Sequence, residues 1–224
     1  MLQQALSNEL SRMGKVVEVS ALLSMVVVDS GDPAFSNPSK PVGPWFSHEQ
    51  MLAARKEEER WVEVPQKGWR KVVPSPKPVK IVGTRSIETL LKDGRVVIAC
   101  GGGGVPVVED ENGFLRGVEA VIDKDMASEC LATSIRADIL MLLTDVPRVC
   151  LNFGTPEEKP IGKISLHGMK KIVEENKFPA GSIGPKIEAV IRFVEAGGER
   201  AIITSLDQAE EALKGKTGTI IVSE

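Results

Sequence analysis

The sequence contains no tyrosine, and aromatic residues make up only 4% of its 224 residues. Proteins that bind single-stranded nucleic acid stack the bases on aromatic side chains, which this chain has few of. The net charge of −3 also gives no general electrostatic attraction to a phosphate backbone or to an anionic membrane surface. We therefore expect no nucleic-acid partner and no membrane partner.

Cysteine and histidine are scarce as well. The three cysteines (Cys100, Cys130 and Cys150) are too few and too scattered for a disulfide framework. They also lack the spacing of metal ligands, and with only two histidines a zinc site is not expected. We expect free thiols in a reducing cytoplasm, no protein-built metal site and no catalytic histidine.

Long apolar runs are missing too, since none approaches the length of a membrane span. The opening "MLQQALSNELSR" lacks the basic-then-apolar order of a signal peptide and instead has the spacing of an amphipathic helix. With 42% hydrophobic residues, the chain is long enough for one substantial core. These features predict a cytoplasmic globular protein.

Proline and tryptophan gather in one segment. Eight of the 14 prolines and all three tryptophans lie between about residues 31 and 79. Within it, Ser47 and Gln50 have the spacing of a helix capping box. A disordered linker is one interpretation, but linkers seldom carry three tryptophans. We favour a small subdomain at 31–79 inserted into a single domain that spans 1–224.

After Ile81 the pattern becomes regular. Helical segments alternate with short continuous apolar runs such as "RVVIAC" and "ADILMLLTD". This alternation predicts an α/β fold with a mostly parallel sheet covered by helices on both faces. Ligands of such sheets bind at the carboxyl ends of the strands.

Four consecutive glycines, Gly101, Gly102, Gly103 and Gly104, follow the strand predicted at "RVVIAC". Such a cluster marks a sharp turn or a close approach of the backbone to something else, often a phosphate. No Gly-Lys-Ser or Gly-Lys-Thr follows, so this is not a Walker-type loop. Any positive charge for a phosphate has to come from elsewhere in the chain.

Lysines occur at two predicted helix starts. In "VIDKD", Asp123 and Asp125 flank Lys124 where a strand is expected to pass into a helix, and "GSIGPK" places Lys186 in the same position. Aspartate is a good N-cap, but the helix dipole disfavours a lysine there unless an anion also binds. An ordinary capped helix start remains the alternative at each place. Together the two turns favour a phosphate site.

A third lysine, Lys40, stands between prolines in "NPSKPVGPW". Rigid flanks fix the direction of a side chain before a ligand arrives. An exposed lysine on a stiff turn is the plainer interpretation.

Six segments resemble the carbamate kinase family, a branch of the amino acid kinase superfamily, in order and over most of the chain. They are "DPAFSNPSKPVGPW", "GWRKVVPSPKP", "ACGGGGVPV", "GVEAVIDKDMAS", "ADILMLLTDV" and "FPAGSIGPKIEAVIRFVEAGGERAIITSL". The resemblance implies a three-layer αβα sandwich with a protruding subdomain and a homodimer. It also implies reversible phosphoryl transfer between MgATP and carbamate, giving ADP and carbamoyl phosphate, often in the ATP-forming direction of arginine or purine-derivative catabolism.

The resemblance also implies residue roles. Lys124 and Lys186 would neutralise the transferring group, Asp125 would orient both lysines, and Lys40 would reach toward carbamate. The four glycines would approach carbamoyl phosphate. The nucleotide pocket would be lined by Thr144, Asp145, Val146, Gly181, Ser182, Ile183 and Gly184. Cys150 and Phe153 stand where the family usually has a ring near the nucleotide base.

The family's N-terminal "GGNA" and "HGNGPQVG" segments have no counterpart here, so we expect this chain to correspond to the C-terminal portion of the family domain. Two alternatives stay open beside a working carbamate kinase. One is an inactive fragment that binds nucleotide or carbamoyl phosphate. The other is a sister kinase that acts on an amino acid carboxylate.

Overall fold

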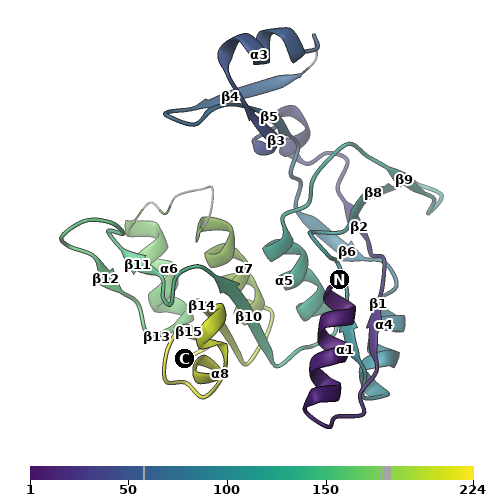
Figure 1. The fold of residues 1–224 in the computed structure, drawn as a ribbon, viewed down its shortest axis with the longest axis vertical. Helices are drawn as coiled ribbons and strands as arrows, with labels where there is room; N and C mark the ends of the chain where they lie inside the picture. The colour runs from purple at the N-terminus through teal and green to yellow at the C-terminus, as the bar shows by residue number, and fades with distance from the viewer. Residues whose placement is uncertain (58, 177, 179–182) are drawn as a thin grey trace.

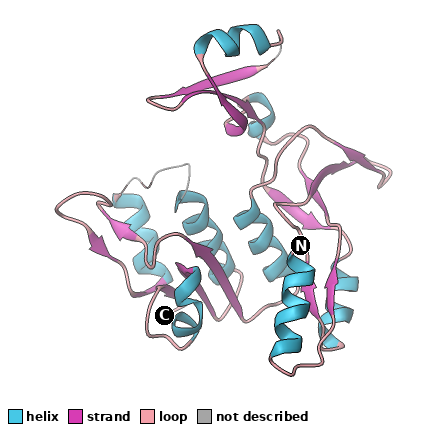
Figure 2. Cartoon of the chain, viewed as in Figure 1, coloured by secondary structure: helices cyan, strands magenta, loops and turns pink. Residues whose placement is uncertain are grey.

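The structure, a computed structural model, describes residues 1–57, 59–176, 178 and 183–224 and has the expected α/β class (Figure 1, Figure 2). Two α/β halves lie side by side, and a small unit of strands and one helix rises above one of them. Helix α5 (Lys124–Ser134) lies between the halves. It contributes Met126 to the core of one half and Ala127 to the core of the other.

The C-terminal half has three layers. Its sheet has the strand order β10 (Ile139–Thr144), β14 (Arg200–Ser205), β15 (Thr219–Val222), β13 (Lys163–Ser165). One face packs on α5, α6 (Leu166–Glu175) and α7 (Ile183–Glu195), and the other on α8 (Ala209–Leu213). The alternation along β14 produces this, since Ala201 and Ile203 lie in the larger core while Ile202 packs with Ala212 of α8. A hairpin of β11 (Cys150–Leu151) and β12 (Lys159–Pro160), and a short 3₁₀ helix, Leu206–Gln208, complete this half.

The N-terminal half contains a second four-stranded sheet and a separate parallel pair. The sheet has the order β6 (Pro78–Ile81), β2 (Met25–Val28), β8 (Val105–Glu109), β9 (Leu115–Gly117). The pair consists of β1 (Val19–Ala21) and β7 (Val96–Ile98). The helices are α1 (Leu2–Arg12), α2 (Pro33–Ser36) and α4 (Thr84–Lys92). The apolar run from Val16 to Asp29 forms two strands, β1 and β2, separated by residues 22–24.

The glycine cluster lies in the connection from β7 to β8, and these two strands pair with the successive strands β1 and β2. Val19 of β1 lies opposite Val96 of β7, and Met25 of β2 lies opposite Val105 of β8. The chain takes nine residues to go from Val96 to Val105 but only six from Val19 to Met25, so it carries three extra residues. The glycine loop (residues 101–104) takes up this excess.

Residues 40–73 form the unit that rises above the N-terminal half (Figure 1). Its antiparallel sheet has the order β3 (Lys40–Phe46), β5 (Gly68–Val73), β4 (Arg60–Val64), and α3 (His48–Ala54) packs on it. The expected capping box of Ser47 and Gln50 is present at the start of α3. Aromatic rings pack within the unit, with Phe46 edge-on to Trp61 at 5.1 Å between centroids.

Two expectations about strands need correction. The sheets are mixed rather than mostly parallel, because β9 turns back on β8 through a tight turn at Asp110–Gly113 and β15 runs antiparallel to β14. No strand leads into α5 either. Residues 118–123 are irregular, and the Val121 N–H donates to the carbonyl of Pro74, the residue that follows the rising unit. Among the described residues, no helix is long and apolar enough to span a bilayer.

Candidate functional site

The N-terminal ends of α5 and α7 lie next to each other and carry a buried ion pair. The Lys186 ammonium donates to Asp125 Oδ2 at 2.8 Å, and each side chain is only 11% exposed. Each helix N-terminus carries partial positive charge from its unpaired N–H groups. Asp125 balances the charge of Lys186, so the two helix ends and the exposed Lys124 give this region the positive character that suits an anion.

Asp125 pairs with Lys186 but not with Lys124. Asp125 was expected to orient both lysines, and the structure pairs it with Lys186. The Lys124 side chain is exposed, and within the described ranges it makes no ion pair with any carboxylate. Its ammonium remains available to a ligand at the start of α5.

Lys40 reaches the same helix start from the rising unit. Its ammonium donates to Asp123 Oδ2 at 2.6 Å, across 83 positions of sequence. Asp123 is the N-cap of α5, and its other oxygen accepts from the N–H groups of Asp125 and Met126. Burial by itself would raise the pKa of Asp123, but the Lys40 ammonium and these two N–H groups outweigh it and lower the pKa. Asp123 is therefore an ionised partner of Lys40, a role that the sequence pattern did not indicate beyond its being a cap.

The four glycines divide into two pairs. A Cβ on Gly103 would lie 2.3 Å from the Ile122 carbonyl oxygen, and one on Gly104 would lie 2.4 Å from Val26 Cγ2. Close packing within the protein accounts for these two. Gly101 and Gly102 are exposed, and no atom of the described part of the chain lies within 4 Å of a Cβ added to either. Since Ile122 directly precedes the N-cap of α5, the glycine loop lies beside the lysine-bearing helix start.

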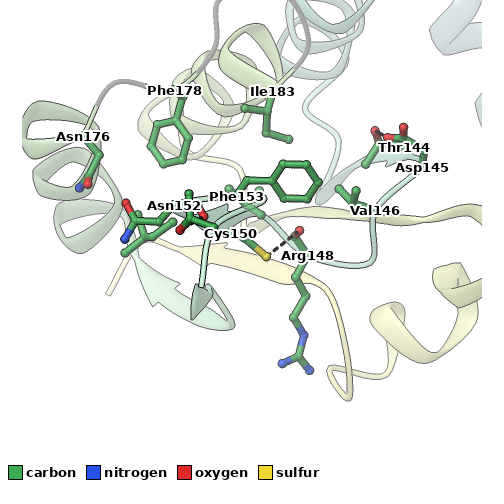
Figure 3. Close-up of a pocket in the computed structure, with 13 residues that line it drawn as sticks. Thr144, Asp145, Val146, Arg148, Cys150, Asn152, Phe153, Asn176, Phe178 and Ile183 are labelled. Atoms are coloured by element: carbon green, nitrogen blue, oxygen red, sulfur yellow. Dashed lines mark hydrogen bonds between the residues drawn. The ribbon is translucent and has the colours of Figure 1, made fainter. Parts of the chain in front are cut away.

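A cavity of about 430 Å³ opens at the carboxyl end of β10 (Figure 3). Four residues expected at the nucleotide line it: Thr144, Asp145, Val146 and Ile183. Gly184 belongs to the first turn of α7 but does not line the cavity. Gly181 and Ser182 lie outside the described residues. The cavity has the position that strand-end binding predicts for an α/β sheet.

Aromatic and sulfur groups give this cavity its character. Cys150 and Phe153, noted in the sequence, both line it, and Phe178 and Asn176 join them from beyond α6 (Figure 3). Nothing in the sequence around these last two residues marked them as cavity residues. Burial raises the pKa of the Cys150 thiol, and the nearby Glu158 adds to the effect. The Cys150 thiol therefore stays neutral, and the cavity offers two phenyl rings to a planar ligand beside the charged Asp145 and Arg148.

Helix α7 connects the cavity to the lysines. Ile183 lines the cavity, and Lys186 lies three residues further along the same helix, a rise of about 4.5 Å. Asp125 then links Lys186 to α5, and Asp123 on α5 links to Lys40. Lys40, Asp125 and Lys186 are thus linked through Asp123 in one continuous chain of contacts, and the exposed Lys124 lies beside it at the start of α5.

Comparison with known proteins defines the class. The Amino acid kinase family matches residues 2–205, and this chain belongs to that family. Solved structures agree. A protein from Aeropyrum pernix K1 superposes with a TM-score of 0.92 at 45% identity, covering 100% of this chain and 72% of that one.

Several similar proteins within the family are named carbamate kinase. The carbamate kinase of Thermococcus kodakarensis is 52% identical over 100% of this chain and 71% of its own length. That of Pyrococcus horikoshii is 50% identical over 98% of this chain and 70% of its own length. Carbamate kinase from Giardia lamblia bound to AMP-PNP superposes with a TM-score of 0.87 at 39% identity, covering 98% and 70% of the two chains. Sequence and structure together indicate a kinase-type phosphotransferase.

Proposed function

We propose that this chain catalyses reversible phosphoryl transfer between ATP and carbamate, giving ADP and carbamoyl phosphate. One observation carries the proposal: the buried Asp125–Lys186 pair lies between a nucleotide-sized cavity and two further lysines, Lys124 and Lys40, at the start of α5. Phosphoryl transfer depends on positioning and charge neutralisation of the moving group, which such an arrangement provides. Relatives named carbamate kinase at about half identity support the choice of acceptor.

In this proposal, each group of residues contacts a different part of the substrates. The nucleotide base occupies the cavity lined by Thr144, Asp145, Val146 and Ile183, and Gly181, Ser182 and Gly184 belong to the same pocket in this proposal. Lys186, held by Asp125, and the exposed Lys124 neutralise the transferring phosphoryl group. Lys40 faces the carbamate side, and the open glycines Gly101 and Gly102 approach carbamoyl phosphate. Carbamate oxygen is already an anionic nucleophile, so no general base is needed.

Magnesium is expected to enter with the nucleotide. Within the described residues, no group of three or more His, Cys, Asp or Glu side chains is arranged to hold a metal ion. Mg²⁺ fits such a site because it keeps several waters and is held largely by phosphate oxygens. When bound, it neutralises charge on the β- and γ-phosphates.

Three further properties belong to the proposal. A homodimer and the ATP-forming direction of arginine or purine-derivative catabolism follow from the family resemblance. A cytoplasmic location follows from the free thiols, of which Cys100 and Cys130 are buried.

A panel of acceptors tests the proposal. With MgATP, we expect ADP release to depend on carbamate and to remain at background with aspartate, glutamate or acetate. Turnover with an amino acid carboxylate but not with carbamate would instead identify a sister amino acid kinase.

A further inference from the structure

We propose that Asp123 is a positioning residue that holds Lys40 at the start of α5 and so sets where the charge of Lys40 meets the substrate. The inference deepens the proposed function and rests on it for its kinetic arm. Three observations carry it: the two-sided use of the Asp123 carboxylate, the place of Lys40 in the rising unit, and a second contact beside the first.

The two oxygens of Asp123 have different partners. Oδ1 accepts from the Asp125 and Met126 N–H groups at 2.9 and 3.3 Å, whereas Oδ2 accepts from Lys40 Nζ at 2.6 Å. The Asp123 side chain is 17% exposed and that of Lys40 is 36% exposed. One carboxylate thus fixes the helix end that carries Lys124 and Asp125 and also fixes a lysine from another unit.

Lys40 needs such a partner because of where it stands. It is the first residue of β3, at the base of the unit, and a free lysine side chain has many rotamers. Its ammonium has three N–H donors, so a bond to Asp123 leaves two for a substrate oxygen. Fixing the side chain in advance lowers the entropy lost when the anionic substrate binds.

The backbone reinforces the same contact. The Val121 N–H donates to the Pro74 carbonyl at 2.9 Å, just beyond the end of β5, the strand that pairs with β3. Lys40 lies opposite Val73 in that pairing. The Lys40 ion pair and the Pro74 hydrogen bond therefore both end on residues 121–123. Together they hold the ion pair in a defined place rather than on a free surface.

Asp123→Asn tests the inference because asparagine is as good an N-cap as aspartate but carries no charge. Asp110→Asn is the matched control. Asp110 Oδ1 also accepts two backbone N–H groups, and its Oδ2 pairs with Arg116 at 3.1 Å, in the turn between β8 and β9. Each substitution removes one carboxylate charge that accepts from two backbone N–H groups and pairs with one cation, at a helix start for Asp123 and in a turn for Asp110.

We expect Asp123→Asn to lower kcat/KM for carbamoyl phosphate about tenfold, as the loss of one charge-assisted hydrogen bond does, while KM for ADP changes less than about twofold. Asp110→Asn leaves both unchanged. In a Lys40→Met background, Asp123→Asn produces no further loss, because the residue acts through Lys40. A kcat/KM equal to or above that of the parent, or losses that simply add, would overturn the proposal.

Hydrogen exchange keeps this result separate from that of the proposed function. If the parent forms no ATP, the proposed function fails, but the contact remains measurable. Asp123→Asn should speed amide exchange in residues 40–46 relative to the parent and to Asp110→Asn. Equal exchange in all three proteins would show that Asp123 does not hold Lys40.

Discussion

Among individual residues, the proposed site depends most on Asp125 and Lys186, which form a buried ion pair. Removing two charges from water is costly, and the pair recovers this cost only because the geometry is good. Such a pair is poor evidence for stability in itself. Its value here is that it holds an ammonium rigidly between the cavity and the start of α5.

Lys186→Met tests this at the level of the side chain. The substitution leaves the Asp125 carboxylate buried without a partner, so we expect the free energy of unfolding to fall by about 3 kcal/mol and ATP formation to be lost. In the double variant Asp125→Leu/Lys186→Met, most of the unfolding free energy should return while activity stays absent. Urea denaturation and an ATP assay measure the two effects. Activity in the double variant would show that the pair serves stability alone.

The thiols report on the cavity. Burial raises the pKa of Cys130 to about 11 and also raises the pKa of Cys150, so little thiolate exists at neutral pH and alkylation should quicken as pH rises. Cys150 lines the cavity and is half-buried, whereas Cys100 and Cys130 are buried. We expect iodoacetamide to modify Cys150 first, and MgADP to slow that reaction several-fold. Peptide mass spectrometry identifies the modified residue, and no protection by MgADP would place the nucleotide elsewhere.

Among the elements, the glycine loop combines two needs in four residues. Gly103 and Gly104 allow the chain to pass against Ile122 and Val26, whereas Gly101 and Gly102 face open space. The loop is possible because the segment from Val96 of β7 to Val105 of β8 is three residues longer than the segment from Val19 to Met25 with which it pairs. Packing therefore occupies Gly103 and Gly104, and the proposed approach of carbamoyl phosphate falls to Gly101 and Gly102.

Two alanine substitutions separate these needs. Gly103 has φ of +140° and no room for a Cβ, so Gly103→Ala should lower the free energy of unfolding by about 2 kcal/mol or more. Gly102→Ala should change it by less than about 0.5 kcal/mol. The same Gly102→Ala protein should nevertheless show a higher KM for carbamoyl phosphate, because the methyl group occupies the space that the ligand approaches. An unchanged KM would remove the loop from the substrate site.

How far the sequence predicts these elements depends on the range of the interactions. Caps, helix starts and apolar strands follow local rules, so the capping box at Ser47, the start of α5 at Asp123 and the strand before the cavity are found where expected. The bond between Lys40 and Asp123 joins residues 83 positions apart, and no local pattern encodes it. The packing of Gly103 on Ile122 likewise appears only in the folded chain.

Across the whole molecule, α5 is the helix that contacts both halves and the rising unit. It lies between the two halves, and the rising unit meets its first residues through Lys40. The mixed sheets could not be read from alternating helices and strands, because β15 runs antiparallel to β14 although helix α8 lies between them in the sequence. The expected position of the ligand did not depend on that detail, since the cavity still lies at the carboxyl end of β10.

The oligomeric state is a prediction at this scale. Helix α1 has no buried residue, and Leu2 at its start and Met13 just after its end are about 60% exposed. The homodimer that the family resemblance implies would offer such side chains a partner surface. We expect light scattering to give about twice the chain mass of 24.2 kDa. A monomer mass at micromolar concentration would contradict the homodimer.

ATP formation from ADP, Mg²⁺ and carbamoyl phosphate by the purified protein is the most direct test of the proposed activity. Lys124→Met removes an exposed lysine at the start of α5, and Lys92→Met, at the end of α4, removes an exposed lysine elsewhere. Neither change should affect the melting temperature, since surface substitutions cost little. We predict ATP from the parent and from Lys92→Met, and a loss of at least about a hundredfold in Lys124→Met. A cooperatively folded parent that forms no ATP, or a Lys124→Met protein as active as the parent, would contradict the account.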